Sequence, residues 1–534
     1  MAFDRRVNSR SGQVRRPVMP VVALAVWGVV YGWPLVAIAQ RSVAGVAGRA
    51  GLSWSSVHEV LTDGRIGRLA LVSLAQTGVS VVVVSLIGVP LGWVLGRLDF
   101  GGRRLLAAAV MVPFVLPTLT VAGSMLAIVG GLPTSNVARF ALIVGAHVCF
   151  NAGLMARSVA VAVAAVPPSV EEAARSLGRP PWWAAAATLG AVRASILGAA
   201  IVVAMFCMTS FGVIVALGGA SLGTIEVEVW YLTTRSLDLA SAAVLAATQF
   251  VVMALLVVCY QRFRPTAIGR VSFSVRQVST RWERRVSWAA MITVGLVSGV
   301  PLGALVLRSF RGTNGWTVGH YAVLGGPGAD AIAYSLAGAA VATAAALLIA
   351  APLVAAAARS DRVGRWFEGA LVLPIAVSAA TLGLGFLVAF SGPTLDLRGT
   401  WIVVPLVQAA GAAPVVARIV LSAVRSLDHD QLAAAAVLGA GQRRRLTTIV
   451  WPALRRPAGV AAGFAFAMAV GEYGATVFLS RANRPTVPVL IGRLLGRPGE
   501  ANLGQALALS CVLGAIAALS VALVDRSTGD GPAW

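Results

Sequence analysis

One acidic residue stands deep within an apolar segment of this chain of 534 residues. Glu472 is the only acidic residue that we place well inside such a segment, and Tyr473 follows it directly. An ionisable side chain within a membrane span is costly and therefore marks a functional candidate. Its carboxylate would contact a passing solute, or it would pair with an arginine or a helix end and hold the protein together. Both alternatives remain open from the sequence.

Other reactive residue types do not form a recognisable site. The four cysteines occur singly in apolar stretches, and the histidines (His58, His147, His320, His429) are scattered. All 43 basic residues are arginine, so the lysine that a P-loop places against nucleotide phosphates has no counterpart here. We therefore expect no catalytic residue, no metal site and no cofactor on this chain, with any ATP and Mg²⁺ bound by a separate polypeptide.

The composition indicates a membrane protein. The chain is 58% hydrophobic and 12% charged, with a mean hydropathy of +0.84, whereas soluble domains carry about 25% charged residues. The net charge of +23 does not gather in one patch, because the arginines punctuate long apolar runs. We expect no nucleic-acid partner, and we expect contacts with membrane lipid.

Apolar stretches long enough to cross a bilayer predict an all-α membrane protein with about 12 transmembrane helices. Six precede a charged linker and six follow it, near residues 18–39, 70–96, 106–130, 140–165, 191–217 and 240–260, then 288–307, 334–357, 367–391, 400–423, 457–480 and 503–524. The excess of arginine in alternate loops predicts that both termini are cytoplasmic.

The two halves are related by an internal repeat. Gly178 and Gly439 are 261 positions apart, and Arg97 and Arg359 are 262 apart. A nearly constant offset indicates duplication, and two units of six helices have the same topology, so the axis that relates them lies along the membrane normal. We expect a first unit over 1–260, a cytoplasmic arginine-rich linker over 261–287, and a second unit over 288–534.

A long cytoplasmic segment between the fourth and fifth predicted helices of each unit carries a second pattern. In the first unit, over 166–190, Ser169 and Glu172 have the spacing of a capping box at the start of a short helix. The sequence Glu172-Ala173-Ala174 is followed by Gly178, a residue type that permits a left-handed turn at the end of the helix. In the second unit, over 424–452, the matching residues are Ala433, Ala434, Ala435 and Gly439. Asp428 or Asp430 would cap the helix there.

These segments resemble the EAA loops of binding-protein-dependent ABC permeases. Repeat one keeps the acid and the glycine, and repeat two keeps Ile449 and Pro452 of the later part of the motif, with Trp451 in place of its leucine. The resemblance implies a permease of a bacterial inner membrane. Its partners would be a cytoplasmic ABC ATPase homodimer, which the two loops contact, and an extracytoplasmic solute-binding protein. Glu172 would pair with a basic residue of the ATPase or cap its own helix.

The pathway is expected between the halves. Ser210, beside Thr209, is the counterpart of Glu472 at the repeat offset, and Tyr473 follows Glu472, so we expect these four residues to line the path. The segments that follow alternate apolar and polar residues, which predicts extended or re-entrant chain at the outer mouth. They supply four candidate contacts for a binding protein, namely Glu226, Glu228, Arg481 and Arg484.

The sequence leaves a second class and several solutes open. Gly96-Arg97 to Arg103-Arg104 resembles a loop of proton-coupled major-facilitator transporters, although tight turns rich in Gly and Arg arise from topology alone. Among ABC permeases, the run Phe211 to Gly219 resembles the thiamine type, and fused chains of this size also resemble ferric-iron permeases. The run Gly471 to Thr476 resembles molybdate and sulfate permeases. Thiamine is favoured, with ferric iron next.

Overall fold

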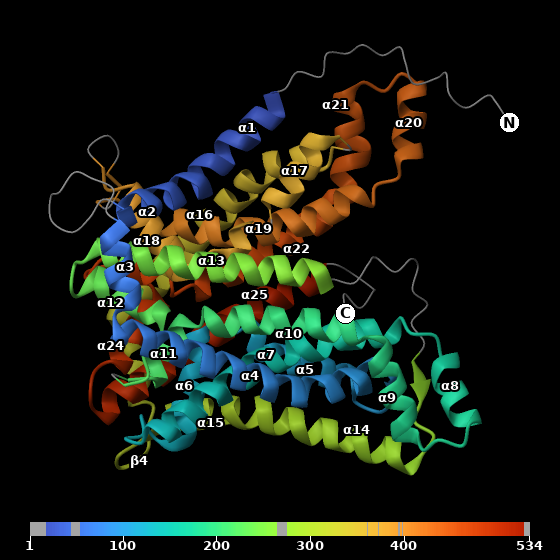
Figure 1. Ribbon diagram of the computed structural model, residues 1–534, viewed down its shortest axis with the longest axis horizontal. Coiled ribbons are helices and arrows are strands. Elements are labelled where there is room, and N and C mark those ends of the chain that lie inside the picture. The colour runs from blue at the N-terminus through green and yellow to red at the C-terminus, as the bar shows by residue number, and fades with distance from the viewer. Residues whose placement is uncertain are drawn as a thin grey trace.

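The computed structural model describes residues 18–43, 54–263 and 275–527, apart from 220, 360, 372, 393–395 and 398. Its helices run roughly parallel to one another, with α12 and α24 at one end of the molecule and α8, α9, α20 and α21 at the other (Figure 1). The first half contains α1 (Val18–Trp27), η1 (Gly28–Gly32), α2 (Trp33–Val43), α3 (Trp54–Thr62), α4 (Gly64–Arg97), β1 (Leu98–Asp99), α5 (Arg103–Val115), α6 (Thr118–Val129), α7 (Asn136–Ala164), α8 (Ser169–Ser176), α9 (Pro181–Ala191), α10 (Arg193–Met208), α11 (Phe211–Leu217), α12 (Ile225–Thr234) and α13 (Leu239–Phe263).

The second half follows the same order of long and short helices. It contains β2 (Arg276–Gln277), α14 (Arg281–Val294), η2 (Gly295–Gly299), α15 (Val300–Ser309), β3 (Arg311–Gly312), β4 (Gly315–Trp316), η3 (Gly319–Gly325), α16 (Pro327–Ala357), α17 (Arg362–Ala370), η4 (Leu373–Ala376), α18 (Ala379–Ala389), α19 (Val403–Arg425), α20 (His429–Val437), α21 (Gln442–Arg445), η5 (Leu446–Val450), α22 (Trp451–Gly471), α23 (Thr476–Leu479), α24 (Val487–Leu495) and α25 (Glu500–Ser527).

The all-α membrane architecture is confirmed, but several predicted spans are not single helices. Within the described residues, eight helices are long and apolar enough to cross a membrane, and ten segments qualify if each bent pair counts as one span. One such pair is α5 and α6, which meet at 103° across Leu116, the C-cap of the first helix, and Pro117, the N-cap of the second. The predicted span at 367–391 is divided among α17, η4 and α18, and those at 191–217 and 457–480 break after Met208 and Gly471.

The duplication is visible in matched hydrogen bonds as well as in element order. The backbone N–H of Ile225, at the start of α12, donates to the Ser73 hydroxyl oxygen at 3.1 Å. In the second half Val487 N–H, at the start of α24, donates to the Ser335 hydroxyl oxygen at 2.8 Å. Both pairs are separated by 152 residues. The same fold therefore forms twice, down to the side chain that satisfies the first turn of a short helix.

The first helix of each half packs against the other half. The indole N–H of Trp27 donates to the carbonyl of Ala370, and the Tyr31 hydroxyl donates to the carbonyl of Ala410 at 2.8 Å. In return, α14 lies beside α4 and α5, where Trp282 contacts Trp93 with ring centroids 5.5 Å apart (Figure 1). The predicted units 1–260 and 288–534 are therefore consecutive in sequence but not separate in packing. The first helix of each unit packs against the other unit.

The described part of the linker is structured. Strands β1 and β2 pair in parallel, with Leu98 opposite Arg276 and Asp99 opposite Gln277. Helix α14 begins at Arg281, where Thr280 and Glu283 form a capping box. The end of the predicted linker is therefore attached to the end of α4.

Candidate coupling loops and translocation path

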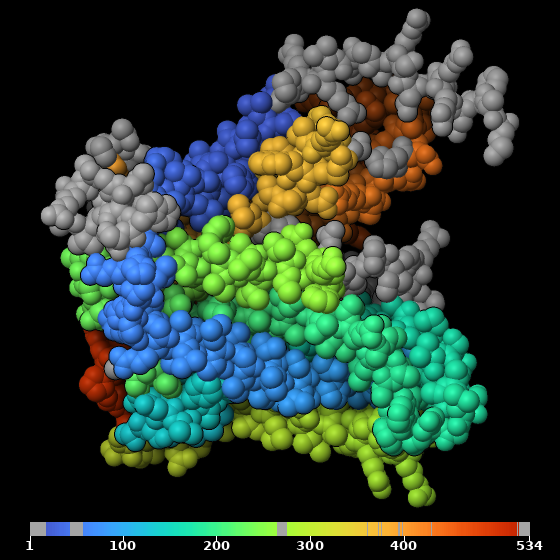
Figure 2. Space-filling view, viewed as in Figure 1, coloured from blue at the N-terminus to red at the C-terminus, as the bar shows by residue number. Residues whose placement is uncertain are grey.

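The short helices α8 and α20 end in the same way. Gly178 and Gly439 have φ of +70° and +81°, a conformation that glycine adopts without a steric penalty. The N–H after each glycine donates five residues back, from Arg179 to Ala174 and from Ala440 to Ala435. The predicted left-handed turns are therefore present in both halves. They lie at the same end of the molecule, on either side of a hollow that Figure 2 shows between the arm carrying α20 and the arm carrying α8.

The predicted capping box of the first loop is wrong. Helix α8 begins at Ser169 itself, and its N-cap Pro168 forms no side-chain cap. Glu172 and Ala173 are exposed and Ala174 is half-buried, so this motif faces outward. In the second loop Asp428 is the cap, accepting from the N–H groups of Asp430 and Gln431. There Ala433 and Ala434 are exposed and Ala435 is half-buried.

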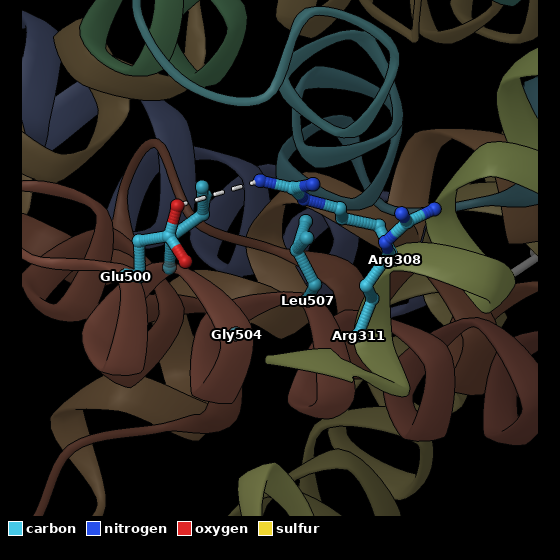
Figure 3. A pocket seen from close by; sticks show the side chains of 6 residues that line it. Arg308, Arg311, Glu500, Gly504 and Leu507 are labelled. Carbon is cyan, nitrogen blue, oxygen red and sulfur yellow. Dashed lines mark ion pairs between the residues drawn. The ribbon is translucent and has the colours of Figure 1, made fainter. Parts of the chain in front are cut away.

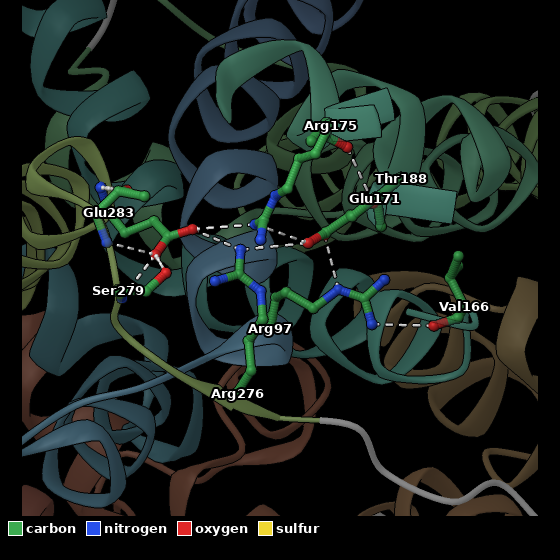
Figure 4. A network of polar contacts seen from close by, with 10 residues as sticks. Arg97, Val166, Glu171, Arg175, Thr188, Arg276, Ser279 and Glu283 are labelled. Atoms are coloured by element: carbon green, nitrogen blue, oxygen red, sulfur yellow. Dashed lines mark hydrogen bonds and ion pairs between the residues drawn. The ribbon is translucent and has the colours of Figure 1, made fainter. Parts of the chain in front are cut away.

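The neighbouring acid, Glu171, was not singled out from the sequence, and it forms the centre of a buried network (Figure 4). One carboxylate oxygen of Glu171 accepts from Arg97 at 2.8 Å and from the Thr188 hydroxyl at 3.0 Å. Arg97 also donates to the carbonyl of Val166 at 3.0 Å. The side chains of Arg97 and Glu171 are 1% and 4% exposed. A buried ion pair persists only with such additional hydrogen bonds, so α8 is firmly attached to the end of α4.

The same network reaches the linker and the second half. Arg276 lies 3.3 Å from Glu171 and 2.6 Å from Glu283, and Arg175 lies 3.3 Å from Glu283. Glu283 is fully buried and also accepts from the N–H groups of Ser279 and Thr280. We refer to Arg97, Glu171, Arg175, Arg276 and Glu283 as the clamp. The clamp connects α8, the linker and α14 (Figure 4).

Helix α20 has no equivalent attachment among the described residues. The counterpart of Arg97 is Arg359, which pairs with the adjacent Asp361 and lowers the pKa of that carboxyl to about 2. The counterpart of Glu171 at the repeat offset is Leu432, and no residue of α20 whose burial is described is buried. The two coupling loops are therefore alike in backbone and different in how they are held.

The break between α10 and α11 places Thr209 and Ser210 between two apolar helices. The Ser210 hydroxyl lies 2.8 Å from Nε2 of His147, whose Nδ1 lies 2.9 Å from the Ser80 hydroxyl. Thr209 donates to the carbonyl of Met205 in its own helix. His147 is 2% exposed. The role of His147 could not be predicted from the sequence, because a single polar residue in an apolar helix forms no pattern with its neighbours.

The matching break in the second half is held by Glu472. Its carboxylate accepts from the N–H groups of Ala475 and Thr476, each at 2.8 Å, and from the Thr476 hydroxyl. The sequence left open whether Glu472 contacts the solute or pairs with an arginine or a helix end. These contacts favour pairing with a helix end, because the carboxylate caps the start of α23. The two breaks thus use different side chains at corresponding positions.

Aromatic residues from both halves meet beside these breaks. Phe211 lies 5.4 Å from Tyr473, 6.0 Å from Trp230 and 6.4 Å from Phe478, measured between ring centroids. We call these four residues the aromatic junction. A Cβ at Gly212 would lie 2.6 Å from the Thr118 hydroxyl and 3.4 Å from Cδ1 of Tyr473, so a glycine allows the chain to pass close to both. Phe211 and Tyr473 are 3% and 5% exposed, so the halves are closed against each other at this level.

The comparisons with known proteins agree with this geometry. Residues 348–528 match the family described as binding-protein-dependent transport system inner membrane component. The thiamine transport system permease protein ThiP of Brucella suis is 26% identical over 98% of both chains. That of Haemophilus influenzae is 24% identical over 82% of this chain and 84% of its own.

Along its length the chain is similar to fused permeases of binding-protein-dependent ABC importers, and its second half matches the model of that family. It is a multi-pass transporter subunit, and the major-facilitator alternative is not supported. A putative 2-aminoethylphosphonate permease protein, PhnV of Salmonella paratyphi A, is 32% identical over 30% of this chain and 60% of its own. This shorter match reflects the permease fold, whereas the thiamine permeases match the fused chain along its length.

Two of the four residues predicted to contact a binding protein are buried. The segments expected to be extended are the helices α12 and α24. Glu226 is 1% exposed and accepts from the N–H of Ala380 at 3.2 Å and from Gln249. Glu228 is 6% exposed and pairs with Arg65 at 2.8 Å. Both acids are therefore turned inward here.

The other two predicted contacts, which are arginines, are exposed. Arg481 and Arg484 are exposed, so they remain candidates for contact with a binding protein. Arg308 and Arg311 border a small pocket beside Glu500, and Arg308 lies 3.7 Å from that acid (Figure 3). The end of the second half that carries α24 thus presents these arginines.

Proposed function

We propose that this permease carries thiamine into the cell, driven by ATP hydrolysis on a separate ATPase homodimer and supplied by an extracytoplasmic binding protein. The observation that carries the proposal is the whole-length similarity to thiamine permeases of two bacterial genera. The membrane would be the bacterial inner membrane, with both termini in the cytoplasm. The arginine-rich ends that carry α8, α20 and α21 support that orientation.

The aromatic junction suits the proposed solute. Thiamine joins an aromatic pyrimidine to a thiazolium cation, and aromatic faces attract cations and stack on flat rings. Phe211 and Tyr473 come from opposite halves, so a movement that separates the halves would expose both rings to the pathway. Thr209, Ser210, Glu472 and Tyr473 are proposed to line that pathway, while the Glu472 carboxylate keeps its hydrogen bonds to the start of α23.

In this proposal the coupling loops transmit the movement of the ATPase to the membrane helices. Glu172, Ala173, Ala174 and Gly178 of α8, with Ala433, Ala434, Ala435 and Gly439 of α20, would contact one ATPase subunit each. Small exposed side chains let a short helix seat closely, and the left-handed glycines separate it from the next helix. Closure of the ATPase dimer would bring the two loops together across the hollow in Figure 2.

The test is uptake of labelled thiamine at nanomolar concentration by cells with and without this gene. The proposal predicts that high-affinity uptake is lost on deletion and restored by the intact gene. Restoration should fail with the Gly178→Val/Gly439→Val double variant at equal membrane levels. Unchanged uptake on deletion would reject thiamine, and ferric-iron uptake would be measured next in the same strains.

A further inference from the structure

A groove beside α4, α9 and α14 is separate from the coupling loops and from the proposed translocation path. It encloses about 210 Å³ between α4, α9 and α14, and each residue that lines it is apolar or aromatic. Three of them are tryptophans, Trp93, Trp182 and Trp282, one from each helix. The clamp is close to all three helices, because Arg97 ends α4, Glu283 belongs to α14, and Thr188 of α9 donates to Glu171.

The groove lies at the depth of a membrane boundary. Helix α4 ends at Arg97, α9 begins at Pro181 and α14 begins at Arg281, all within a few residues of the lining side chains. Tryptophans concentrate where lipid headgroups meet hydrocarbon. At this depth an apolar groove that opens to the bilayer takes up hydrocarbon more favourably than water. The groove therefore fits an acyl chain.

Three exposed arginines of α14 are next in sequence to residues that line the groove. Arg281, Arg284 and Arg285 are exposed on the first turns of α14, next in sequence to Trp282 and Val286 of the lining. The acid of these turns, Glu283, is fully buried in the clamp and does not offset them at the surface.

This charge is also at the less favourable end of its helix. The start of a helix carries partial positive charge, and cations there destabilise it unless an anion is close. A further arginine is close to the α9 side of the groove. The guanidinium of Arg179 lies 4.9 Å above the ring of Trp183, and Trp183 contacts Trp182 of the lining. An anionic headgroup beside α14 would satisfy both helix and arginines.

We propose that this groove holds one phospholipid with an anionic headgroup. An acyl chain lies between Trp93, Trp182 and Trp282, and the phosphate contacts the arginines at the start of α14. The lipid fills the space between α9 and α14 and holds the α8–α9 hairpin against the exchanged helix. This site is separate from the solute path, and its existence does not depend on which solute the permease carries.

The experiment is native mass spectrometry of the full chain, released from nanodiscs that contain equal amounts of phosphatidylglycerol and phosphatidylcholine. We expect one phosphatidylglycerol to remain bound in preference to phosphatidylcholine. Arg281→Gln/Arg284→Gln/Arg285→Gln should reduce that retention about tenfold or more, since each arginine near a membrane surface attracts anionic lipid appreciably. Ala186→Trp, which fills the groove and leaves every charge in place, should reduce it similarly.

The matched control is Arg443→Gln/Arg444→Gln/Arg445→Gln. It removes the same charge from the same side of the membrane, at α21, away from the groove. Retention should be unchanged in this variant. Equal loss in both triple variants, or no loss with Ala186→Trp, would overturn the proposal, because binding would then depend on general surface charge. Equal retention of the two lipids by the unaltered chain would also overturn it.

Discussion

Arg97 and Glu171 form an ion pair, 2.8 Å long, that joins the end of a membrane helix to the first coupling loop. Both side chains are almost completely enclosed, and Thr188 and the carbonyl of Val166 complete their hydrogen bonds. The duplicated half does not repeat the pair, because Leu432 stands where Glu171 would be. Movement of α8 must therefore move α4 and α14, whereas α20 is tied less closely to its own half.

Glu171→Gln should destabilise the chain and weaken coupling of the first loop. The change keeps the side chain's size and removes the charge that faces Arg97 and Arg276. Breaking a buried pair from one side costs about 3–5 kcal/mol. We expect a lower melting temperature for the purified chain and reduced uptake per molecule in the membrane, measured by thermal unfolding in detergent and by solute uptake.

Glu172→Gln is the matched control for that prediction. Glu172 is adjacent and exposed, so the same substitution should leave the free energy of unfolding within about 0.5 kcal/mol of that of the unaltered chain. If Glu172→Gln lowers uptake at unchanged stability, Glu172 contacts the ATPase. If the two variants melt alike, the clamp does not stabilise the loop as we infer.

Substitution of the left-handed glycines should uncouple the transporter. Gly178→Val or Gly439→Val places a β-branched residue at positive φ, which costs about 1–3 kcal/mol of local strain and alters the exit from α8 or α20. We expect ATP hydrolysis by the assembled importer to continue while uptake falls. Gly441→Val is the control, because Gly441 lies two residues beyond the second turn with φ of −62°, and a Cβ added there would meet no atom within 4 Å. Uptake equal to that of this control in both variants would refute the role of the turns.

The features that occur in both halves could be predicted from the sequence. The 261- and 262-residue offsets, the apolar runs and the glycines indicated two membrane units with two loops, because each rests on local pattern or composition. The left-handed turns at Gly178 and Gly439 followed from residue type alone.

Features that depend on distant contacts could not be predicted. Glu171 and Glu172 are equivalent in a capping pattern, and only the packing of α4 and the linker buries the first. The helix breaks near Met208 and Gly471 lie within long, mostly apolar runs, which hydropathy counts as single spans. The exchange of first helices leaves no signal in the order of the chain.

His147 should position the break between α10 and α11. His147→Ala removes the ring that lies between the Ser80 and Ser210 hydroxyls, and leaving buried polar groups unpaired costs about 1–3 kcal/mol. We expect lower uptake at unchanged membrane levels. Ser80→Ala keeps the contact with Ser210 and should reduce uptake less. Equal losses in the two variants, in uptake assays normalised to protein in the membrane, would show that the Ser210 contact has no special role.

Charge reversal at the outer face should weaken productive docking of the binding protein. Arg481 and Arg484 are exposed, while the nearby acids Glu226 and Glu228 are buried, so the surface offered to a partner is positive. Arg481→Glu/Arg484→Glu should raise the concentration of loaded binding protein needed for half-maximal ATP hydrolysis in proteoliposomes. Exposed charges are screened by salt, so the difference from the unaltered chain should shrink as ionic strength rises. Arg235→Glu, exposed in the loop between α12 and α13 of the first half, should leave the concentration unchanged; an equal shift there would mean that overall charge, and not a docking contact, sets the rate.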